Sequence, residues 1–348
     1  MEPSKKDEKL RVLYLIQEYP QLSQTYVHEE VESLKNDYDI KILTWKRPNL
    51  LRKDPHPYEF IERPDQFLAK ALAFKPHIMH SHYFHQIEVL EGMARQLRVP
   101  YTLRTHSFDI LKPKQEKLAY LAKITHSPYC LRVLCFPDFK ERLLNLGIPE
   151  DKLFSSWPVV NCKIFYNPEK PATKHKIMNV GAALDKKNYK GFIDLASLMQ
   201  GSGNEFNLYV MGYEKDKLVA YNESKGRPVK TITSVEYREM PAVYRAHDWL
   251  VYTGDPSLNT IGLPMAVAEA QSSGIGVCLQ EMPGRKEALL DYLGGAGFLF
   301  KTVEELPEIL SKPYPDEMRL KGLENAKKSD INVHKILLTE VWDRLNKP

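Results

Sequence analysis

Residues 254–274, GDPSLNTIGLPMAVAEAQSSG, form the segment whose residue types best suit chemistry. Gly262, Leu263 and Pro264 lead into a predicted helix that has proline in its first turn. The free N–H groups and positive dipole end of such a helix suit a phosphate. Glu269, a turn or so further on, could accept hydrogen bonds from a sugar hydroxyl. An ordinary loop followed by a buried helix explains the segment equally well on local grounds.

Histidines gather in the first half of the chain. His80, His82 and His85, with His77 nearby, could form a metal cluster, because alternate residues of a strand share one face. No carboxylate or cysteine completes a convincing ligand set in the sequence. We therefore expect no metal, and we interpret the histidines as a polar strand end.

Composition narrows the classes of protein that the chain can represent. No apolar run approaches the roughly 18 residues of a membrane helix, and the first ten residues do not begin a secretory signal. The four cysteines form no CxxC pair, which favours reduced thiols in the cytoplasm. No GxGxxG follows a strand, and basic residues do not cluster with aromatic ones, so dinucleotide and nucleic-acid binding are disfavoured.

The net charge of +4 comes entirely from the first 165 residues. This surplus is compatible with an anionic ligand or with contact with the surface of a membrane. A solvated surface is the commoner explanation of such a weak charge.

The elements that must position these residues alternate between strand and helix. Strands are predicted at 11–16, 40–43, 77–84, 100–106, 176–181, 206–212, 229–231, 249–254, 275–280 and 297–300. Helices are predicted from the N-cap Ser23 to Leu34 and at 64–74, 86–97, 114–123, 189–200, 236–246, 264–273 and 333–346. This pattern predicts an α/β protein with two doubly wound, Rossmann-like domains of parallel strands.

The proline-rich stretch 157–176 has little periodicity and predicts the linker between the domains. We expect an N-terminal domain at 1–165 and a second domain at 166–328. Residues 329–348 contain a last helix that we expect to return to the first domain.

The segment 254–274 resembles the donor-binding motif of retaining glycosyltransferases with the GT-B fold, particularly family 4 (glycosyl transferases group 1). Gly262, Leu263, Pro264, Glu269, Ala270 and Gly274 match the family pattern. The resemblance implies two Rossmann-like domains that face a cleft. It also implies that Glu269 binds the nucleotide ribose and that the amides of 262–265, up to Met265, hold the diphosphate or the sugar.

The segment 179–196, NVGAALDKKNYKGFIDLA, is similar to the family's opening of the second domain. Gly181 ends a strand, and the resemblance gives Lys187 the task of neutralising the donor diphosphate. Taken alone the motif is weak, because lysines in turns are usually solvated. The resemblance to the family rests instead on the order of the motifs along residues 12–300.

The first half of the chain carries three further matches to the family. The segment 15–34 resembles the first loop, which implies that Ser23, Gln24 and Thr25 lie on the acceptor side. HIMHSHYF resembles a strand ending in His-x-His-Phe and places His82 on that side. PYTLRTHSFDIL resembles the strand whose histidine contacts the donor sugar, which gives His106 that role and adds Asp109 to the acceptor side.

Four substitutions depart from the family pattern: Gln24 replaces a glutamate of the first loop, Ser107 replaces a glycine after His106, and two lie in the donor motifs. Ile261 stands where the family has its first glutamate, and Ala182 stands where an arginine is common. We therefore keep three functions open. The first is a metal-independent glycosyltransferase, with His106, Lys187 and Glu269 as catalytic residues. The second is a non-catalytic member that still binds nucleotide, and the third is a sugar-nucleotide epimerase.

The implied partners follow from the leading function. The donor is a nucleotide-diphosphate sugar, the acceptor is a glycan or a lipid-linked glycan, and neither a resident cofactor nor a nucleic acid is expected. We expect a cytoplasmic protein, and the basic excess of the first domain is compatible with peripheral contact with the inner face of the membrane.

Overall fold

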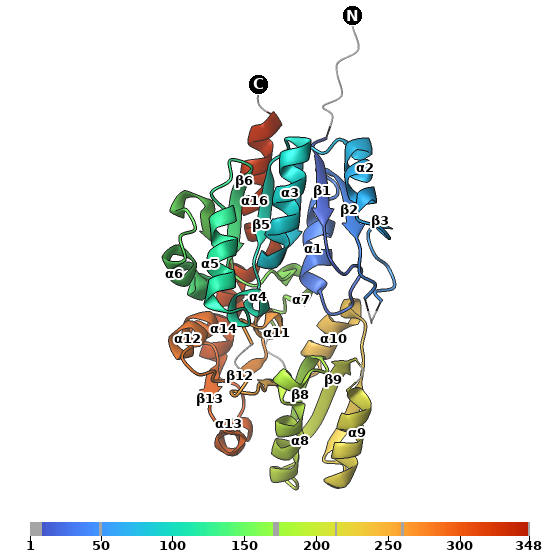
Figure 1. The fold of residues 1–348 in the computed structure, drawn as a ribbon. Coiled ribbons are helices and arrows are strands. Elements are labelled where there is room, and N and C mark those ends of the chain that lie inside the picture. The colour runs from blue at the N-terminus through green and yellow to red at the C-terminus, as the bar shows by residue number, and fades with distance from the viewer. Residues whose placement is uncertain (1–8, 49–50, 170–173, 213, 259–260, 347–348) are drawn as a thin grey trace, which may run out of the picture. The chain divides into compact units, whose positions relative to one another are not determined.

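The protein is described by a computed structural model that covers residues 9–48, 51–169, 174–212, 214–258 and 261–346. The chain forms two compact units (Figure 1). Unit 1 comprises residues 1–157 and 331–348, and unit 2 comprises residues 158–330. The chain therefore leaves unit 1 once and returns to it at the end. The boundary expected at residue 165 and the observed division after Trp157 differ by one short helix.

Unit 1 is built on a parallel sheet with the strand order β3-β2-β1-β4-β5-β6-β7. The strands are β1 (Arg11–Leu15), β2 (Asp39–Thr44), β3 (Tyr58–Phe60), β4 (Ile78–His82), β5 (Tyr101–Arg104), β6 (Cys130–Cys135) and β7 (Leu153–Ser155). The helices are α1 (Thr25–Leu34), α2 (Asp65–Phe74), α3 (Ile87–Leu97), α4 (Ser107–Leu111), α5 (Gln115–Ile124), α6 (Lys140–Asn145), α15 (Ile331–His334) and α16 (Ile336–Trp342).

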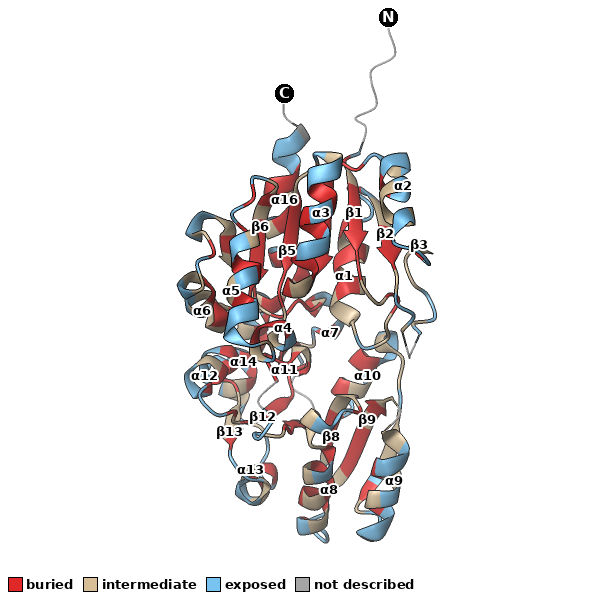
Figure 2. Cartoon of the chain, in the orientation of Figure 1, coloured by how far each residue is buried: buried red, intermediate tan, exposed pale blue. Residues whose placement is uncertain are grey.

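The strands of unit 1 are buried because helices cover the sheet. All five residues of β4 are buried, whereas α2 buries only Ala71 (Figure 2). The C-terminal helix α16 closes one part of this core with Trp342, which is fully buried beside Tyr14 of β1. Parallel strands with crossover helices require burial of this kind.

Unit 2 repeats the same architecture with the strand order β10-β9-β8-β11-β12-β13. The strands are β8 (Lys176–Ala182), β9 (Glu205–Met211), β10 (Val229–Thr233), β11 (Trp249–Tyr252), β12 (Gly276–Gln280) and β13 (Phe298–Phe300). The helices are α7 (Cys162–Phe165), α8 (Tyr189–Leu198), α9 (Lys215–Ser224), α10 (Met240–Arg245), α11 (Met265–Ser272), α12 (Lys286–Leu293), α13 (Leu306–Leu310) and α14 (Asp316–Ala326).

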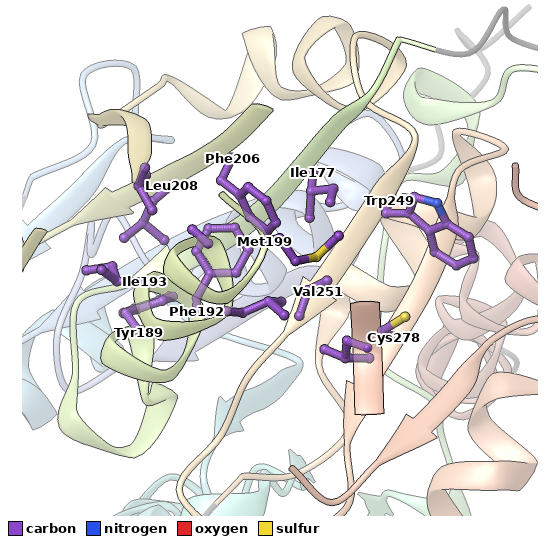
Figure 3. Packing of buried hydrophobic residues seen from close by; sticks show 14 of the residues in the cluster. Ile177, Tyr189, Phe192, Ile193, Met199, Phe206, Leu208, Trp249, Val251 and Cys278 are labelled. Carbon is purple, nitrogen blue, oxygen red and sulfur yellow. The ribbon is translucent and has the colours of Figure 1, made fainter. Parts of the chain in front are cut away.

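The core of unit 2 forms where α8 packs on its sheet. Phe192 and Ile193 of α8 meet Phe206 and Leu208 of β9, and the cluster continues through Val251 of β11 (Figure 3). The rings of Phe192 and Phe206 meet edge to face with centroids 5.7 Å apart. This apolar layer fixes the strands whose carboxyl ends carry the predicted donor residues.

The order of strands along each sheet reverses at one point. In unit 1 this switch point lies between β1 and β4, and in unit 2 it lies between β8 and β11. Loops that leave the carboxyl ends of strands at such a point diverge and leave room for a ligand. The sequence places His82 and the turn containing Lys187 directly at these two points.

Three details of the predicted elements are wrong. The strands β3, β6 and β7 have no counterpart in the expected set, and β3 and β7 are only three residues long. Ser23 is not an N-cap: the amide of Gln24 bonds the carbonyl of Gln21 in a turn, and Gln24 precedes the first helical residue of α1. The last helix is broken into α15, α16 and a 3₁₀ turn at Asp343–Asn346.

None of the helices in the described ranges is both long enough and apolar enough to cross a membrane.

Candidate active site

Lys187 lies at the carboxyl end of β8, in a 3₁₀ turn formed by Asp185–Lys187. The turn is held against the strand on the other side of the switch point. The hydroxyl of Thr253 donates to the carbonyl of Lys187 over 2.7 Å, and the side-chain amide of Asn179 donates to the same hydroxyl oxygen over 2.9 Å. The lysine is therefore fixed through its backbone, which leaves its ammonium group to be placed by packing.

The ammonium group of Lys187 sits over an aromatic ring. Its Nζ atom lies 4.3 Å from the centroid of Tyr252, the last residue of β11. Burial of the charged form, together with the nearby charge of Lys186, lowers the pKa of Lys187 to about 7. An ammonium group whose pKa lies near 7 is stabilised in its charged form when an anion binds beside it.

Gly181 approaches two side chains of the same turn. A Cβ atom at Gly181 would lie 2.8 Å from the hydroxyl oxygen of Tyr189 and 3.8 Å from Nζ of Lys187. Gly181 also has a φ of +141°, which glycine adopts readily. Within the described ranges, the buried Tyr189 hydroxyl has no hydrogen-bond partner. The lack of a side chain at Gly181 therefore leaves space beside the hydroxyl of Tyr189 and the ammonium group of Lys187.

The second predicted group of donor residues precedes and begins helix α11. Pro264 is the N-cap of the helix in an extended conformation, and its carbonyl accepts a hydrogen bond of 2.8 Å from the hydroxyl of Tyr292. The guanidinium of Arg285 donates to the carbonyl of Ile261. Gly262, Leu263 and Pro264 are buried, while Met265 is partly exposed. Side chains from and beside α12 thus hold the backbone that leads into α11.

Ile261 contributes an apolar contact where the family pattern has a carboxylate. The residue is 5% exposed. A Cβ atom at Gly254 would lie 2.5 Å from its Cδ1 atom and 2.4 Å from Cε of Met282, so the three residues pack tightly at the end of β11. Unlike the carboxylate of the family pattern, the side chain of Ile261 cannot accept a hydrogen bond, but the backbone around it is well packed.

Glu269 is buried within α11 and is bonded to a tyrosine. Its Oε2 atom accepts a hydrogen bond of 2.7 Å from the hydroxyl of Tyr244 in α10, and Glu269 is 6% exposed. The ring of Tyr244 in turn meets Phe165 of α7 edge to face, with centroids 5.5 Å apart. The carboxylate is thereby held in one orientation by a neutral donor.

In unit 1, His82 at the end of β4 lies in a chain of hydrogen-bonding groups. Its Nε2 atom is 3.1 Å from Oε1 of Glu30 in α1, and its Nδ1 atom is 3.1 Å from Nε2 of His106. The two imidazole rings stack with an interplanar angle of 17°. His82 and His106, which belong to two different sequence motifs, are therefore in direct contact.

His106 is enclosed by two tyrosines. The ring centroids of Tyr26 and Tyr83 lie 4.4 Å and 4.7 Å from that of His106, and the two tyrosine hydroxyls bond each other. Tyr83 has a φ of +75°, a strained conformation for a side chain of this size. Burial holds the pKa of His106 well below its usual range, so the imidazole is neutral at physiological pH.

Asp109 fixes the backbone on which His106 is carried. The two residues form a capping box at the start of α4, in which the Asp109 carboxylate accepts from the His106 amide over 2.8 Å. The other carboxylate oxygen accepts from the amide of Phe84. Burial raises the pKa of Asp109 to about 7. The contacts of Asp109 thus bind the turn after β4 to the turn after β5.

Glu30 is a carboxylate that the sequence does not point to. Its Oε2 atom accepts a hydrogen bond of 2.9 Å from Nε of Arg104, whose Nη2 atom lies 2.8 Å away. Its Oε1 atom lies 3.2 Å from the hydroxyl of Tyr14, which donates to it, and within 3.2 Å of the Nε2 atoms of His80 and His82. Burial alone would raise its pKa, but the positive charge of Arg104 holds the pKa well below its usual range. The carboxyl group is therefore ionised.

The expectation that no carboxylate joins the histidines is wrong. Glu30, His80 and His82 bring one ligand atom each within 4.8 Å of one another, the spacing of a metal site. Glu30 comes from a helix some fifty residues earlier, so no local spacing could reveal it. The guanidinium of Arg104 already supplies the cation, and a divalent ion would add two unbalanced charges to an unexposed region. His77 and His85 bond elsewhere, to Arg11 and Gln17.

The three predicted acceptor-side residues of the first loop lie at the start of α1. Ser23 is exposed, and Gln24 and Thr25 are partly exposed. In the described part of the chain, Oε1 of Gln24 is buried without a hydrogen-bond partner. Their assignment to the acceptor side stays a prediction.

The sequence of unit 2 matches a known family. The model of the family "Glycosyl transferases group 1" matches residues 163–329. The residues of unit 2 that the family resemblance singled out occupy the switch point between β8 and β11 and the start of α11.

Solved structures share the fold of the whole chain. The Anabaena protein HepE in complex with UDP has a TM-score of 0.76, is 14% identical, and the match covers 96% of this chain and 100% of that one. Sucrose-phosphate synthase from Thermosynechococcus elongatus gives 0.72 at 14% identity, with 96% and 99% covered. A glycosyltransferase from Rickettsia africae gives 0.66 at 12% identity, with 98% and 100% covered. No curated protein matches the chain in a sequence search. The predicted GT-B fold with two Rossmann-like units is confirmed.

Proposed function

We propose that the protein transfers a sugar from a nucleotide-diphosphate donor to a glycan or lipid-linked acceptor, with retention of configuration. The observation that carries the proposal is the partly buried Lys187, whose ammonium group lies over the ring of Tyr252 at the switch point of a unit that matches the glycosyl transferases group 1 model. A cation in this setting requires an anion to justify its burial. A diphosphate satisfies this requirement.

The leaving diphosphate would be stabilised electrostatically. Lys187 would supply a compact positive charge, and the amides at the start of α11 would supply oriented dipoles. Glu269, oriented by Tyr244, would accept hydrogen bonds from the ribose hydroxyls. The backbone of Gly181 would lie beside the phosphates. Together these groups require no metal ion.

The residues of unit 1 would serve the sugar and the acceptor. His106 would contact the donor sugar, and Ser23, Gln24, Thr25, His82 and Asp109 would line or support the acceptor side. A neutral imidazole suits this task, because a charged one would repel the positive charge that develops on the sugar in the transition state.

Calorimetric titration with a panel of nucleoside diphosphates tests the donor site directly. UDP belongs in this panel, since the similar HepE structure contains it. We expect one nucleotide to bind, and we expect Lys187→Ala and Glu269→Ala to weaken binding. Lys190→Ala is the control, because Lys190 is an exposed lysine of the same segment. Absence of binding, or equal binding by all three variants, would rule out the assigned site.

A non-catalytic nucleotide-binding role is the second candidate. The buried, apolar Ile261 and the small Ala182 remove two polar groups of the family pattern. Losing one charge-assisted hydrogen bond to a diphosphate costs about 1.5–3 kcal/mol, which weakens binding without abolishing it. An assay for release of nucleoside diphosphate separates the two: a non-catalytic protein binds the nucleotide but releases none from any donor sugar.

We also propose peripheral contact between the basic first unit and an anionic membrane that presents the acceptor. Its excess of four positive charges would favour such contact. Co-sedimentation with phosphatidylglycerol vesicles should fall as salt rises from low to physiological concentration. Equal recovery with neutral vesicles would exclude the proposal.

A further inference from the structure

We propose that Glu30 is a positioning residue that acts through His82 to hold the imidazole of His106 in one tautomer and one orientation. The inference rests on the proposed function only for its catalytic consequence, because the hydrogen-bonded chain itself is a property of unit 1. Glu30 lies in α1, His82 at the end of β4 and His106 after β5, so three elements meet through these side chains.

The direction of each hydrogen bond follows from what the groups can donate. An ionised carboxylate only accepts, so Nε2 of His82 carries the hydrogen that points to Glu30 over 3.1 Å. His106 is neutral, and one of its ring nitrogens accepts from the backbone in the capping box at the start of α4. His106 must therefore donate from Nε2 over the 3.1 Å between the two rings. Its Nδ1 atom is left as an acceptor, which is what the capping box with Asp109 requires.

Arg104 holds the carboxylate of Glu30, which forms one end of the series of hydrogen bonds. Its Nε and Nη2 atoms both contact Oε2 of Glu30, whereas the histidines contact Oε1. Oε2 of the carboxylate thus faces the arginine, and Oε1 faces the histidines. The hydroxyl of Ser156 accepts a further hydrogen bond from Arg104 and also contacts Nδ1 of His334 at 3.1 Å. Arg104, which holds the carboxylate of Glu30, is thus itself held by Ser156.

His80 provides an internal comparison. It lies two residues before His82 on the same strand face, and its Nε2 atom is 3.2 Å from the same carboxylate oxygen. Its other nitrogen, however, is 2.8 Å from the hydroxyl of Thr102, which accepts from the indole N–H of Trp342. His80 therefore shares the carboxylate with His82 but ends in a structural contact.

The titratable groups that contact the two ends of the hydrogen-bonded chain come from several elements. Within the described part of the protein, Glu30 contacts Tyr14, His80, His82 and Arg104, and His106 contacts Tyr26, His82, Tyr83 and Asp109. The positive charge of Arg104 lies directly against the negative charge of Glu30. The donor and acceptor sites of these neighbours set the tautomers of the histidines.

Replacing Glu30 by glutamine makes a specific prediction. The two Arg104 donors will bind the side-chain carbonyl of glutamine, because only that end accepts hydrogen bonds. Its NH₂ group then faces His82, which must accept at Nε2 and donate from Nδ1. His106 must in turn accept at Nε2 and carry its hydrogen on Nδ1. Glu30→Gln therefore reverses the tautomers of both histidines.

Long-range ¹H–¹⁵N spectra of the ¹⁵N-histidine-labelled full chain measure these tautomers without any substrate. We expect the Nε2–H form of His106 in the wild type and the Nδ1–H form in Glu30→Gln. His82→Gln keeps the pair between Glu30 and Arg104 and serves if Glu30→Gln fails to fold; it should leave His106 as a mixture. His80→Gln, the matched control, should leave the His106 tautomer unchanged.

The catalytic consequence is read separately. With a donor that the wild type turns over, we expect His82→Gln to lower kcat about 10- to 100-fold, the cost of a misplaced group, while the nucleotide Kd of unit 2 stays unchanged. An Nδ1–H form in the wild type, or an unaltered His106 in both variants, overturns the proposal. One equivalent of bound zinc whose removal shifts the His80 and His82 signals also overturns it. Failure of the wild type to bind any nucleotide refutes the proposed function but leaves the tautomer result standing.

Discussion

At the scale of single residues, Lys187 couples nucleotide binding to protons. Its pKa is lowered to about 7 in the free protein, and a diphosphate would raise it. Below pH 7 the lysine is already charged, so binding takes up no proton. Between the free and the bound pKa one proton enters with the ligand, and affinity falls by up to about tenfold per pH unit.

We therefore predict that nucleotide affinity declines between pH 7 and pH 9. Titration calorimetry in buffers with different ionisation enthalpies counts the protons taken up, and the expected value approaches one per site. In Lys187→Ala this proton uptake disappears. Uptake that persists in the alanine variant would assign the proton to another group.

Asp109 gives a prediction on stability. Burial raises its pKa from 3.8 to about 7 in the folded protein, so the folded state holds this proton more tightly than the unfolded chain does. The contribution of the group is fully present below its unfolded pKa and is lost as pH rises toward 7.

Asp109→Asn should remove this pH dependence and orphan one of the two amides that the carboxylate serves. We expect unfolding by urea to show a cost of about 1–3 kcal/mol that is larger at pH 5 than at pH 8. The control is Glu116→Gln, which changes an exposed carboxylate of α5. A cost that grows with pH would contradict the assigned proton.

At the scale of elements, the close approach of β11 and β12 depends on one glycine. Gly276 opens β12 opposite Trp249 of β11, and a Cβ atom there would lie 2.2 Å from the indole ring. We predict that Gly276→Ala destabilises unit 2 by about 1–3 kcal/mol, because the ring has to move out of a packed core. Calorimetric unfolding measures the loss.

A second glycine supplies the opposite expectation. Gly92 lies exposed within α3, with no atom in the described part of the chain within 4 Å of an added Cβ. Gly92→Ala should stabilise unit 1 by about 0.5–1 kcal/mol. Equal destabilisation by both changes would show that packing at Gly276 is not the cause.

The sequence predicts elements well where alternation and turn chemistry agree. The strands that carry Gly181 and His82, and the helix that carries Glu269, occur close to their expected places. The short strand β7 was missed because three residues carry no periodicity. In the candidate site, the motif order predicts Lys187, Glu269 and His106, but it does not point to Glu30, Arg104, Tyr244 or Arg285. These partners come from distant segments, and only the folded chain brings them to the motif residues.

At the scale of the whole molecule, the C-terminal segment completes unit 1. Trp342 is fully buried, its ring meets Tyr14 and Tyr38 edge to face, and its indole donates to Thr102. The guanidinium of Arg132 in β6 donates to the carbonyl of Leu337. The last helix is thus an integral part of a core whose other members lie some two hundred or more residues earlier.

We predict that Trp342→Ala costs unit 1 about 3–5 kcal/mol, while nucleotide binding by unit 2 persists at temperatures where unit 2 stays folded. Differential scanning calorimetry with and without nucleotide separates the two units. Ile336→Ala is the matched control, because Ile336 belongs to the same helix but is 48% exposed. Equal losses from the two changes would mean that Trp342 has no special place in the core.

The return of the chain to unit 1 has a consequence for its synthesis. Domains usually fold in the order in which they leave the ribosome. Here all of unit 2 is made before residues 331–346 exist, so unit 1 waits, with the site of Trp342 unfilled, until these residues follow. The histidine network of unit 1, in which Thr102 contacts both His80 and the indole of Trp342, can therefore assemble fully only after unit 2 has been made.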